Sequence, residues 1–225
     1  MSSKSGKHGS KFKAVLFDLD GTLLNTLDDL ADSMNNSLKR FGFPPHPVDT
    51  YKYLIGDGLR NLVFRALPEQ NRDEATINKI ATAEREEYGR NWASKTHPYE
   101  GVPELLDALT ARKIAMCILS NKPDDFTHVI VQKFLSNWKF AAVQGQSKDT
   151  PVKPNPTGAN QIAQKLGLAP AEFLYVGDSN TDMQTANAAR MFPVGVLWGF
   201  RPKDELIEAG AKALIERPQD LLNLV

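Results

Sequence analysis

Four short segments of the chain carry side chains that together could transfer a phosphoryl group. In chain order they are Asp18-Leu19-Asp20-Gly21-Thr22, Ser120-Asn121, Lys153-Pro154 and Gly177-Asp178-Ser179-Asn180-Thr181-Asp182. Each follows, or closely follows, an apolar run that is typical of a buried strand. They supply a nucleophile, a proton carrier, a hydroxyl, a cation and metal-binding carboxylates. The ordered set predicts chemistry through an aspartyl-phosphate, although any one segment alone would be weak evidence.

The first segment places two carboxylates close together. Asp18 and Asp20 flank a single residue just past an apolar run, so an extended chain would direct both to the same side. Two carboxylates at this distance resist joint ionisation unless a cation is present, and Mg²⁺ prefers oxygen ligands. Gly21 permits a sharp change of backbone direction after them. The structural alternative is a helix start capped by Asp20 or Thr22.

The last segment adds two further candidate metal ligands. Asp178 follows the apolar run 173–176, and Asp182 falls four residues later in the first turn of an expected helix. We therefore predict a metal site for Mg²⁺ built from the four carboxylate residues Asp18, Asp20, Asp178 and Asp182. For Asp182, helix capping or support of a neighbour is an equal alternative to direct ligation.

The two middle segments offer contacts for phosphoryl oxygens. Ser120 has a hydroxyl and Asn121 an amide, while Lys153 lies in a proline-flanked loop where its charge could neutralise the phosphoryl group. Alone, these residues would be interpreted as a turn and a solvated lysine. Lys122 is a rival cation of lower rank. The predicted phosphate-binding residues are Ser120, Asn121, Lys153, Gly21 and Thr22.

The rest of the sequence indicates how these segments are positioned. After Pro103 the pattern alternates helices, at 103–112, 124–136, 155–166 and 181–190, with strands at 114–119, 140–143, 173–176 and 193–197. This alternation predicts an α/β core with a mostly parallel sheet, whose ligands bind beyond the carboxyl ends of the strands. Residues 26–94 have helical periodicity and no clear strand, which indicates a helical insert.

Composition excludes several classes of protein. The 225 residues are 41% hydrophobic, and 27 Lys and Arg balance 27 Asp and Glu, so we expect no nucleic-acid partner and no membrane partner. The single cysteine, Cys117, lies in an apolar run and suits a cytoplasmic protein. Residues 1–10 are rich in Ser, Lys and Gly and are expected to form a disordered tail.

With these motifs in place, the chain resembles the haloacid dehalogenase-like hydrolase superfamily from about residue 11 to its end. The resemblance implies a Rossmann-like core of residues 11–25 and 95–225 and a small all-helical cap domain of residues 26–94, inserted after the first strand. It implies that Asp18 is the nucleophile and Asp20 the general acid/base, with Ser120 and Lys153 fixing the phosphoryl oxygens. Mg²⁺ would be held by Asp18, Asp178 and the backbone carbonyl of Asp20.

Within the superfamily the chain looks most like the phosphoglycolate phosphatases. The similarity lies in the segments Ile55–Leu62, Arg65-Ala66-Leu67 and Pro98–Val102. It implies a small phosphorylated metabolite as substrate and a monomer or homodimer. The expected substrate-reading residues are Gly56, Asp57, Gly58, Arg60 and Arg65, although both arginines could equally be solvated helix charges. Asn25-Thr26 stands where such proteins often carry Asp-Ser or Asp-Thr.

Other functions remain open on the same motifs. A sugar-phosphate mutase of the β-phosphoglucomutase type would share the whole core. A phosphonate hydrolase would need a lysine in the insert, for which Lys52 is the candidate. A catalytically idle binding or regulatory protein could use the same fold, but the complete set of acidic residues argues against it.

Overall fold

A six-stranded parallel sheet forms the centre of the protein, which we describe from a computed structural model over residues 11–225. The strand order is β5-β4-β1-β6-β7-β8, and every neighbouring pair is parallel. The strands are β1 Ala14–Phe17, β4 Ala115–Pro123, β5 Ala142–Gln146, β6 Phe173–Gly177, β7 Phe192–Val196 and β8 Ala213–Ile215. The tail predicted for residues 1–10 lies outside the described residues.

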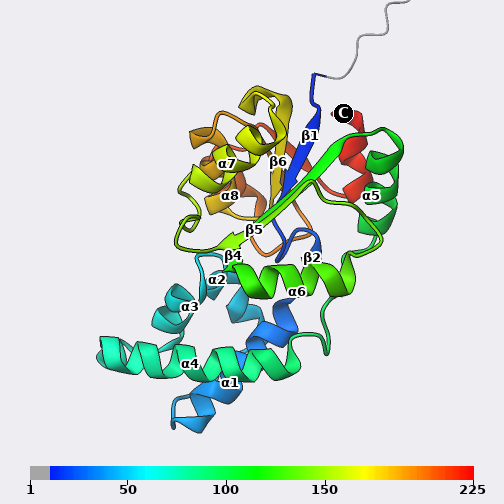
Figure 1. Cartoon of the computed structure of the whole chain (residues 1–225). Helices are drawn as coiled ribbons and strands as arrows, with labels where there is room; N and C mark the ends of the chain where they lie inside the picture. The colour runs from blue at the N-terminus through cyan, green and yellow to red at the C-terminus, as the bar shows by residue number, and fades with distance from the viewer. Residues whose placement is uncertain (1–10) are drawn as a thin grey trace, which may run out of the picture.

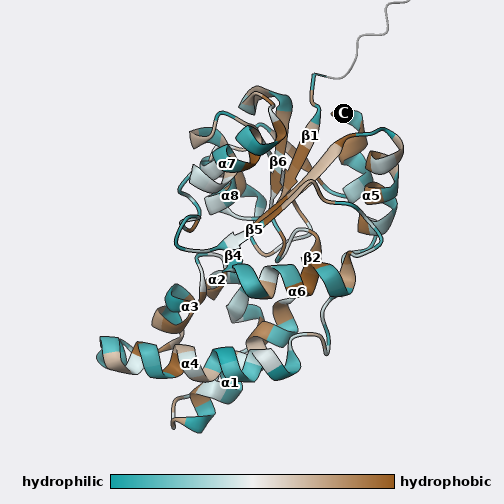
Figure 2. Ribbon diagram, in the orientation of Figure 1, coloured by the Kyte–Doolittle hydropathy of each residue, from teal (hydrophilic) through white to brown (hydrophobic). Residues whose placement is uncertain are grey.

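Strand β1 shows why the central strands of the sheet have continuous apolar sequences. Its alternate residues enter two separate hydrophobic clusters, with Ala14 and Leu16 in one and Val15 and Phe17 in the other. Successive side chains of a strand point to opposite faces, so a strand covered on both faces must be apolar throughout. The apolar colouring of the central strands in Figure 2 follows from this double burial.

Helices cover both faces of the sheet. Helices α7 (Thr157–Leu166) and α8 (Asn180–Ala188) contribute apolar residues to the cluster of Leu16. Helices α5 (Val102–Ala111) and α6 (Asp124–Phe134) contribute to the cluster of Val15, and Figure 1 shows α5 across the sheet from α7 and α8. The remaining core elements are α9 Lys203–Glu208 and the 3₁₀ helices η3 Pro170–Glu172 and η4 Pro218–Asn223.

The segment 26–94, called the helical insert below, lies beyond the carboxyl ends of the strands (Figure 1). Its helices are α1 Leu27–Arg40, α2 Tyr51–Leu54, α3 Leu59–Ala66 and α4 Glu74–Asn91, with 3₁₀ helices η1 Val48–Thr50 and η2 Glu69–Asn71. It contains no strand. Two short strands, β2 Leu24–Asn25 and β3 His97–Pro98, pair antiparallel where the chain enters and leaves it.

The predicted α/β class with a mostly parallel sheet is confirmed, and the differences are at element ends. The strand expected over 114–119 continues to Pro123, with a change of register after Leu119. The strand expected over 140–143 lies at 142–146. Strands β2 and β3 were not predicted, because two residues give no periodic pattern. The division into residues 11–25 with 95–225 and 26–94 stays a prediction.

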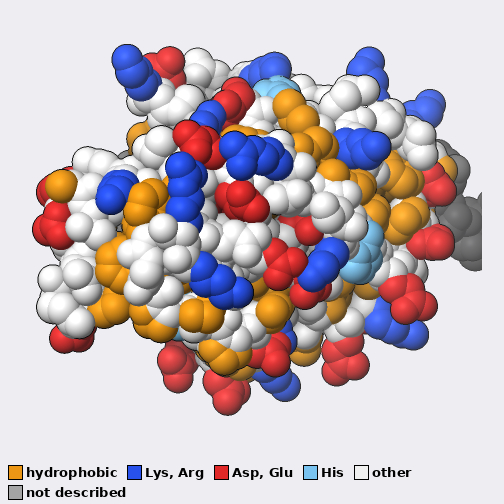
Figure 3. Space-filling model, turned by 90° about the horizontal axis from the view of Figure 1, so that it is seen from below, with side chains coloured by type: hydrophobic (Ala, Val, Ile, Leu, Met, Phe, Trp, Pro, Cys, Tyr) orange, Lys and Arg blue, Asp and Glu red, His pale blue; other side chains and the backbone are white. Residues whose placement is uncertain are grey.

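Two further features concern the helices and the surface of the molecule. No described helix is long and apolar enough to cross a membrane. Figure 3 views the molecule from the side of the helical insert, and on that face acidic and basic side chains are interspersed. Mixed charges of this kind create no extended field of one sign on that face.

Candidate active site

Asp18 follows β1, and only one of its two carboxylate oxygens accepts hydrogen bonds from the described residues. Its Oδ1 accepts hydrogen bonds from the backbone N–H of Leu19 at 2.7 Å and from Nζ of Lys153 at 2.8 Å. Its Oδ2 accepts none from the described residues. Burial and the nearby charge of Asp182 raise the pKa of Asp18 well above its usual value. The side chain is therefore fixed through one oxygen and available for chemistry through the other.

Lys153 is the cation beside this carboxylate. Its Nζ lies 2.8 Å from Oδ1 of Asp18 and 2.7 Å from Oδ1 of Asp182, and it donates to the carbonyl of Leu119 at 3.3 Å. Burial acts to lower the pKa of Lys153, but the two carboxylates outweigh burial and raise it well above its usual value. Lys153 is thus a permanent buried charge that orients Asp18.

Asp178 follows β6 and closes the acidic cluster. Its Oδ2 accepts a hydrogen bond from the backbone N–H of Phe200 at 2.7 Å, and its Oδ1 accepts one from Oγ1 of Thr22 at 3.3 Å. Burial, with a contribution from Asp182, raises its pKa to about 7. A Cβ atom at Gly199 would lie 2.1 Å from Cβ of Asp178, so this approach requires glycine.

The acidic cluster fits a hard divalent cation. Oxygen atoms of Asp18, Asp178 and Asp182 lie within 4.8 Å of one another, and all three residues are buried. Carboxylate oxygens are the donors that Mg²⁺ prefers. A bound cation would also offset the repulsion and burial that raise the pKa values of Asp18 and Asp178.

Within this cluster Asp182 is the most fully hydrogen-bonded residue. Its Oδ1 contacts Nζ of Lys153 at 2.7 Å, and its Oδ2 accepts hydrogen bonds from N–H of Ser179 at 3.1 Å and from Oγ of Ser179 at 2.5 Å. Ser179 in turn caps helix α8. Of the two alternatives left open by the sequence, these contacts favour support of Lys153 over direct ligation.

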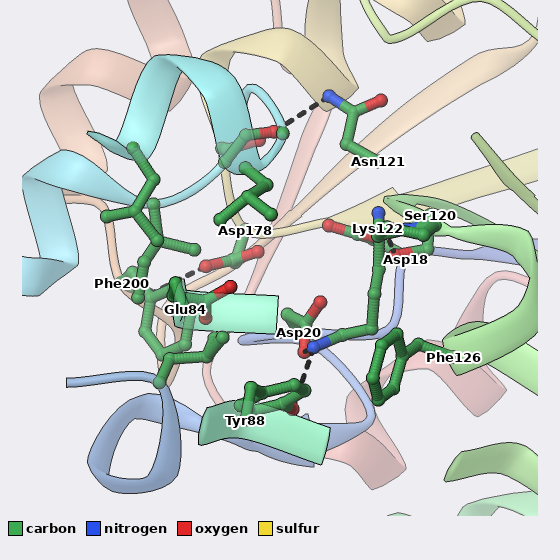
Figure 4. Close-up of a pocket in the computed structure, with 18 of the residues that line it drawn as sticks. Asp18, Asp20, Glu84, Tyr88, Ser120, Asn121, Lys122, Phe126, Asp178 and Phe200 are labelled. Atoms are coloured by element: carbon green, nitrogen blue, oxygen red, sulfur yellow. Dashed lines mark hydrogen bonds and ion pairs between the residues drawn. The ribbon is translucent and has the colours of Figure 1, made fainter. Parts of the chain in front are cut away.

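Asp20 lines the same pocket as Asp18 and is held by two donors. Its Oδ1 accepts a hydrogen bond from Oγ1 of Thr26 at 2.7 Å and lies 3.3 Å from Nζ of Lys122. Nζ of Lys122 also donates to the hydroxyl of Tyr88, on helix α4 of the insert, at 2.8 Å (Figure 4). Burial acts to lower the pKa of Lys122, but Asp20 and Tyr88 outweigh it, so the pKa is raised. The sequence analysis ranked Lys122 below Lys153 as a cation of the site, but the structure shows that Lys122 lines the pocket and contacts Asp20.

The predicted phosphate-binding residues fall into two groups. Ser120 and Asn121 line the pocket together with Asp18 and Asp20. The Asn121 amide is already used, because Oδ1 accepts from N–H of Lys153 at 2.6 Å and Nδ2 donates to the carbonyl of Gly56 at 2.7 Å.

Gly21 and Thr22 lie beside the pocket and have structural contacts instead. The backbone N–H of Gly21 donates to the carbonyl of Leu24 at 2.9 Å. Gly21 has a φ of +83°, and a Cβ atom there would lie 2.3 Å from Oδ2 of Asp178. Gly21 therefore shapes the loop that admits Asp178, and its N–H is not free for a phosphoryl oxygen.

Only two of the five predicted substrate-reading residues line the pocket. Gly56 and Gly58 line the pocket. Arg60 instead pairs with Glu74 near the surface, and Arg65 pairs with Asp57. Neither arginine nor Asp57 lines the pocket, because pairing within the insert already satisfies them.

Other residues of the insert and core complete the pocket, as Figure 4 shows. The sequence analysis did not single out several of them, including Glu84, Arg85, Tyr88, Phe126, Phe200 and Arg201. The helical periodicity of residues 26–94 predicted a helix for Glu84 and Tyr88, but nothing in the sequence showed which residues of the core their side chains would contact. The lysine considered for a phosphonate hydrolase, Lys52, lies outside the pocket and pairs with Asp49 at 2.8 Å.

Comparison with known proteins identifies the class of this site. The family model described as haloacid dehalogenase-like hydrolase matches residues 15–196. The chain therefore belongs to this hydrolase family, and the resemblance seen in its sequence is confirmed.

Individual relatives extend over nearly the whole chain. The phosphoglycolate phosphatase of Mannheimia succiniciproducens is 30% identical over 222 residues, covering 96% of this chain and 99% of the relative. That of Psychrobacter arcticus is 33% identical over 192 residues, covering 83% and 84%. A solved structure from Lactobacillus delbrueckii subsp. bulgaricus, named as a candidate phosphoglycolate phosphatase, has a TM-score of 0.90 at 26% identity and covers 95% of this chain and 98% of its own.

Proposed function

We propose that the protein is a Mg²⁺-dependent phosphatase that hydrolyses a small phosphomonoester through a phosphoryl group carried on Asp18. The observation that carries this proposal is that Oδ2 of Asp18 accepts no hydrogen bond from the described residues, beside a buried lysine and an acidic cluster, with Asp20 lining the same pocket. The family match supports hydrolysis as the reaction. Asp18, Asp178 and the backbone carbonyl of Asp20 would hold the metal ion.

The chain's own residues account for both steps. Oδ2 of Asp18 attacks phosphorus while Asp20 donates a proton to the departing alkoxide, which leaves as an alcohol. Asp20, now ionised, takes a proton from water as the water oxygen attacks phosphorus, which frees phosphate and restores Asp18. Ser120 and Lys153 stabilise the phosphoryl oxygens through a hydroxyl and a fixed charge. When bound, Mg²⁺ would supply positive charge that offsets the negative charge of the phosphoryl group.

The helical insert supports this chemistry as a cap. Its residues line the pocket opposite Asp18, so its closure would exclude bulk water from the aspartyl-phosphate. Two core side chains hold its loop, because Nδ2 of Asn121 donates to the carbonyl of Gly56 at 2.7 Å and a guanidinium nitrogen of Arg201 donates to the carbonyl of Ile55 at 3.1 Å. We propose residues 26–94 as the cap domain and residues 11–25 with 95–225 as the catalytic core.

For the substrate, we propose 2-phosphoglycolate or a related small phosphate ester. The names of the relatives support the first of these. Lys122 lies on the leaving-group side and offers a positive charge there. A mutase of the β-phosphoglucomutase type would use the same core, and it would be recognised by a phosphorylated sugar product in place of free phosphate.

The experiment is a phosphate-release screen over small phosphomonoesters, with and without Mg²⁺. The wild-type protein should release phosphate only with the metal, and Asp18→Asn should release none while keeping the circular dichroism spectrum of the wild type. Asp28→Asn, an acidic change on helix α1 outside the pocket, is the matched control. Unchanged turnover in Asp18→Asn would contradict the proposal.

A further inference from the structure

Glu84 is a buried carboxyl group that enters the pocket without a partner. It lies on helix α4 of the insert, is 3% exposed and lines the same pocket as Asp18 and Asp20. Figure 4 shows its carboxylate directed from α4 into that pocket. Within residues 11–225 it accepts no hydrogen bond, and no cationic nitrogen lies within 4 Å of its oxygens.

The polar groups near Glu84 contact other residues. Nζ of Lys122 contacts Oδ1 of Asp20 and the hydroxyl of Tyr88. Arg85, the next residue on α4, pairs with Asp125 at the surface. The hydroxyl of Tyr51 donates to Oδ1 of Asn35 at 2.7 Å. None of the described residues donates a hydrogen bond to the Glu84 carboxylate, although Lys122 and Arg85 also line the pocket.

Apolar side chains form much of the wall around this carboxylate. The pocket is lined by Leu30, Ile55, Leu59, Leu62, Phe126 and Phe200. A charged group in such surroundings is costly unless it receives hydrogen bonds. Because the fold supplies none, Glu84 does not stabilise the protein, and its placement is explained if the donor arrives with a ligand.

We propose that Glu84 selects the leaving group of the substrate by accepting a hydrogen bond from a hydroxyl on it. This inference rests on the proposed phosphatase function and narrows its substrate class to phosphomonoesters of hydroxylated alcohols. A hydroxyl suits the position because it can donate to Glu84 and also accept from Lys122, whose three N–H groups contact only Asp20 and Tyr88 among the described residues. An ammonium group would meet repulsion from Lys122.

Of the two substrates proposed above, the same geometry favours a related ester that carries a hydroxyl over 2-phosphoglycolate. Once phosphorylated, glycolate has a carboxylate and no hydroxyl, so it offers Glu84 no donor. It also brings a second negative charge toward an unpaired carboxylate in an apolar wall, where the repulsion is weakly screened. Lys122 offsets part of this repulsion, but that lysine is already shared with Asp20.

The test compares esters that differ by one feature. We would measure kcat/KM of the wild type for glycerol 3-phosphate, propyl phosphate, ethanolamine phosphate and 2-phosphoglycolate. Two variants divide the role of Glu84: Glu84→Met removes the acceptor, and Glu84→Gln keeps an acceptor oxygen but removes the charge. Glu86→Gln is the control, since Glu86 is an exposed acid on the same helix that pairs with Arg40.

The wild type should prefer glycerol 3-phosphate to propyl phosphate by about 10- to 100-fold, which is the value of a hydrogen bond to a charged group. Glu84→Met should abolish this preference, and Glu84→Gln should raise kcat/KM for 2-phosphoglycolate by about 10-fold or more. Glu86→Gln should change neither ratio. Both Glu84 variants should keep the circular dichroism spectrum of the wild type, which shows that they fold.

Several results would overturn the inference. Equal wild-type rates on glycerol 3-phosphate and propyl phosphate would do so while leaving the phosphatase function standing. A preference for ethanolamine phosphate, or a preference for glycerol 3-phosphate that survives in Glu84→Met, would also contradict it. If none of the esters is hydrolysed in the presence of Mg²⁺, the result would contradict the proposed function and therefore also this inference.

Discussion

At the scale of single residues, the site depends on how Lys153 divides its contacts. One nitrogen contacts both Oδ1 of Asp18 and Oδ1 of Asp182, and all three side chains are buried. Removing one member of such a group leaves uncompensated buried charge. Asp182 is itself fixed by the cap of helix α8, so a helix start holds the lysine that orients the nucleophile.

Lys153→Met should therefore damage both activity and stability. We expect kcat to fall by about 10³-fold, because a fixed charge beside the phosphoryl group is lost. We also expect the free energy of unfolding to drop by about 3–5 kcal/mol, because two buried carboxylates lose their partner. Urea unfolding and steady-state kinetics measure the two effects, with the exposed Lys165 changed to Met as control. A Lys153→Met variant as stable as the wild type would argue against this arrangement.

Glu84 provides a prediction about pH. Burial raises its pKa from 4.5 to about 7, with Lys122 and Arg85 acting in the opposite direction. The facing Tyr88 has a pKa raised, chiefly by burial, to about 12, so it stays neutral below pH 8. A raised folded-state pKa means that the protonated carboxyl favours folding, and this advantage is lost as the pH rises through about 7.

Glu84→Gln should consequently gain stability over the wild type as the pH rises. In metal-free buffer, the difference in free energy of unfolding should grow by about 3 kcal/mol between pH 4.5 and pH 8. Denaturant unfolding at several pH values measures this difference, in which titrations common to both proteins cancel. Glu86→Gln should give a flat profile, and a flat profile for Glu84→Gln would contradict the buried, unpaired state.

At the scale of elements, the helical insert meets the core through a few side chains. The carboxylate of Asp29, at the start of α1, accepts hydrogen bonds from the backbone N–H groups of Lys95 and Thr96 and from Oγ1 of Thr96. This joins the two connecting segments of the insert. On the opposite side Arg201 donates to the carbonyls of Tyr53 and Ile55, at 3.4 and 3.1 Å.

Arg201→Ala should loosen the insert without unfolding the core. The variant loses the two contacts to the insert and the stacking of its guanidinium on Tyr53, at 5.4 Å from the ring centre. We expect KM to rise by about 10-fold, because hydrogen bonds of this kind contribute about 1 kcal/mol each. Steady-state kinetics measure the change in KM, and thermal unfolding tests whether the core stays folded. The control is the exposed Arg217 changed to Ala. An unchanged KM would show that these contacts do not hold the pocket closed.

The elements also show what the sequence could and could not predict. Strands β1, β4, β6 and β7 were predictable because burial on both faces makes them continuous apolar runs. The extension of β4 through Lys122 to Pro123 was not, because polar residues there face a pocket that only the tertiary structure creates. The same reason hid Glu84, whose helix resembles any other half-exposed helix in sequence.

At the scale of the whole molecule, the acidic cluster couples metal binding to stability. Asp18, Asp178 and Asp182 approach one another only in the folded chain, since Asp18 and Asp178 are 160 positions apart in the sequence. A ligand that binds only the folded state stabilises it, by about 2.7 kcal/mol at a concentration 100 times its Kd.

Addition of Mg²⁺ should accordingly raise the midpoint of thermal unfolding, and EDTA should reverse the change. Asp178→Asn should abolish the rise while leaving the metal-free protein at least as stable, because the variant removes a buried charge whose pKa is raised by burial. Differential scanning calorimetry with a series of Mg²⁺ concentrations measures this. An equal rise in Asp178→Asn would place the metal elsewhere.

The motifs were predictable at this scale because their residues lie near or after the carboxyl ends of neighbouring strands in one parallel sheet. The position of Arg60 and Arg65 outside the pocket was not predictable, because the sequence does not show that Glu74 and Asp57 pair with them. Contacts to substrate depend on how the insert packs on the core, and that packing is set by side chains from both parts.

The most direct test of the central claim is to trap the phosphoryl group on Asp18. The substrate is ³²P-labelled acetyl phosphate, whose good leaving group needs little help from a general acid. Asp20→Asn should accumulate labelled protein with Mg²⁺ because the base for the second step is missing. After acid quench the label should map to the peptide containing Asp18 and be released by hydroxylamine, as an acyl phosphate is. No labelled protein, or a label on any other residue, would contradict the account.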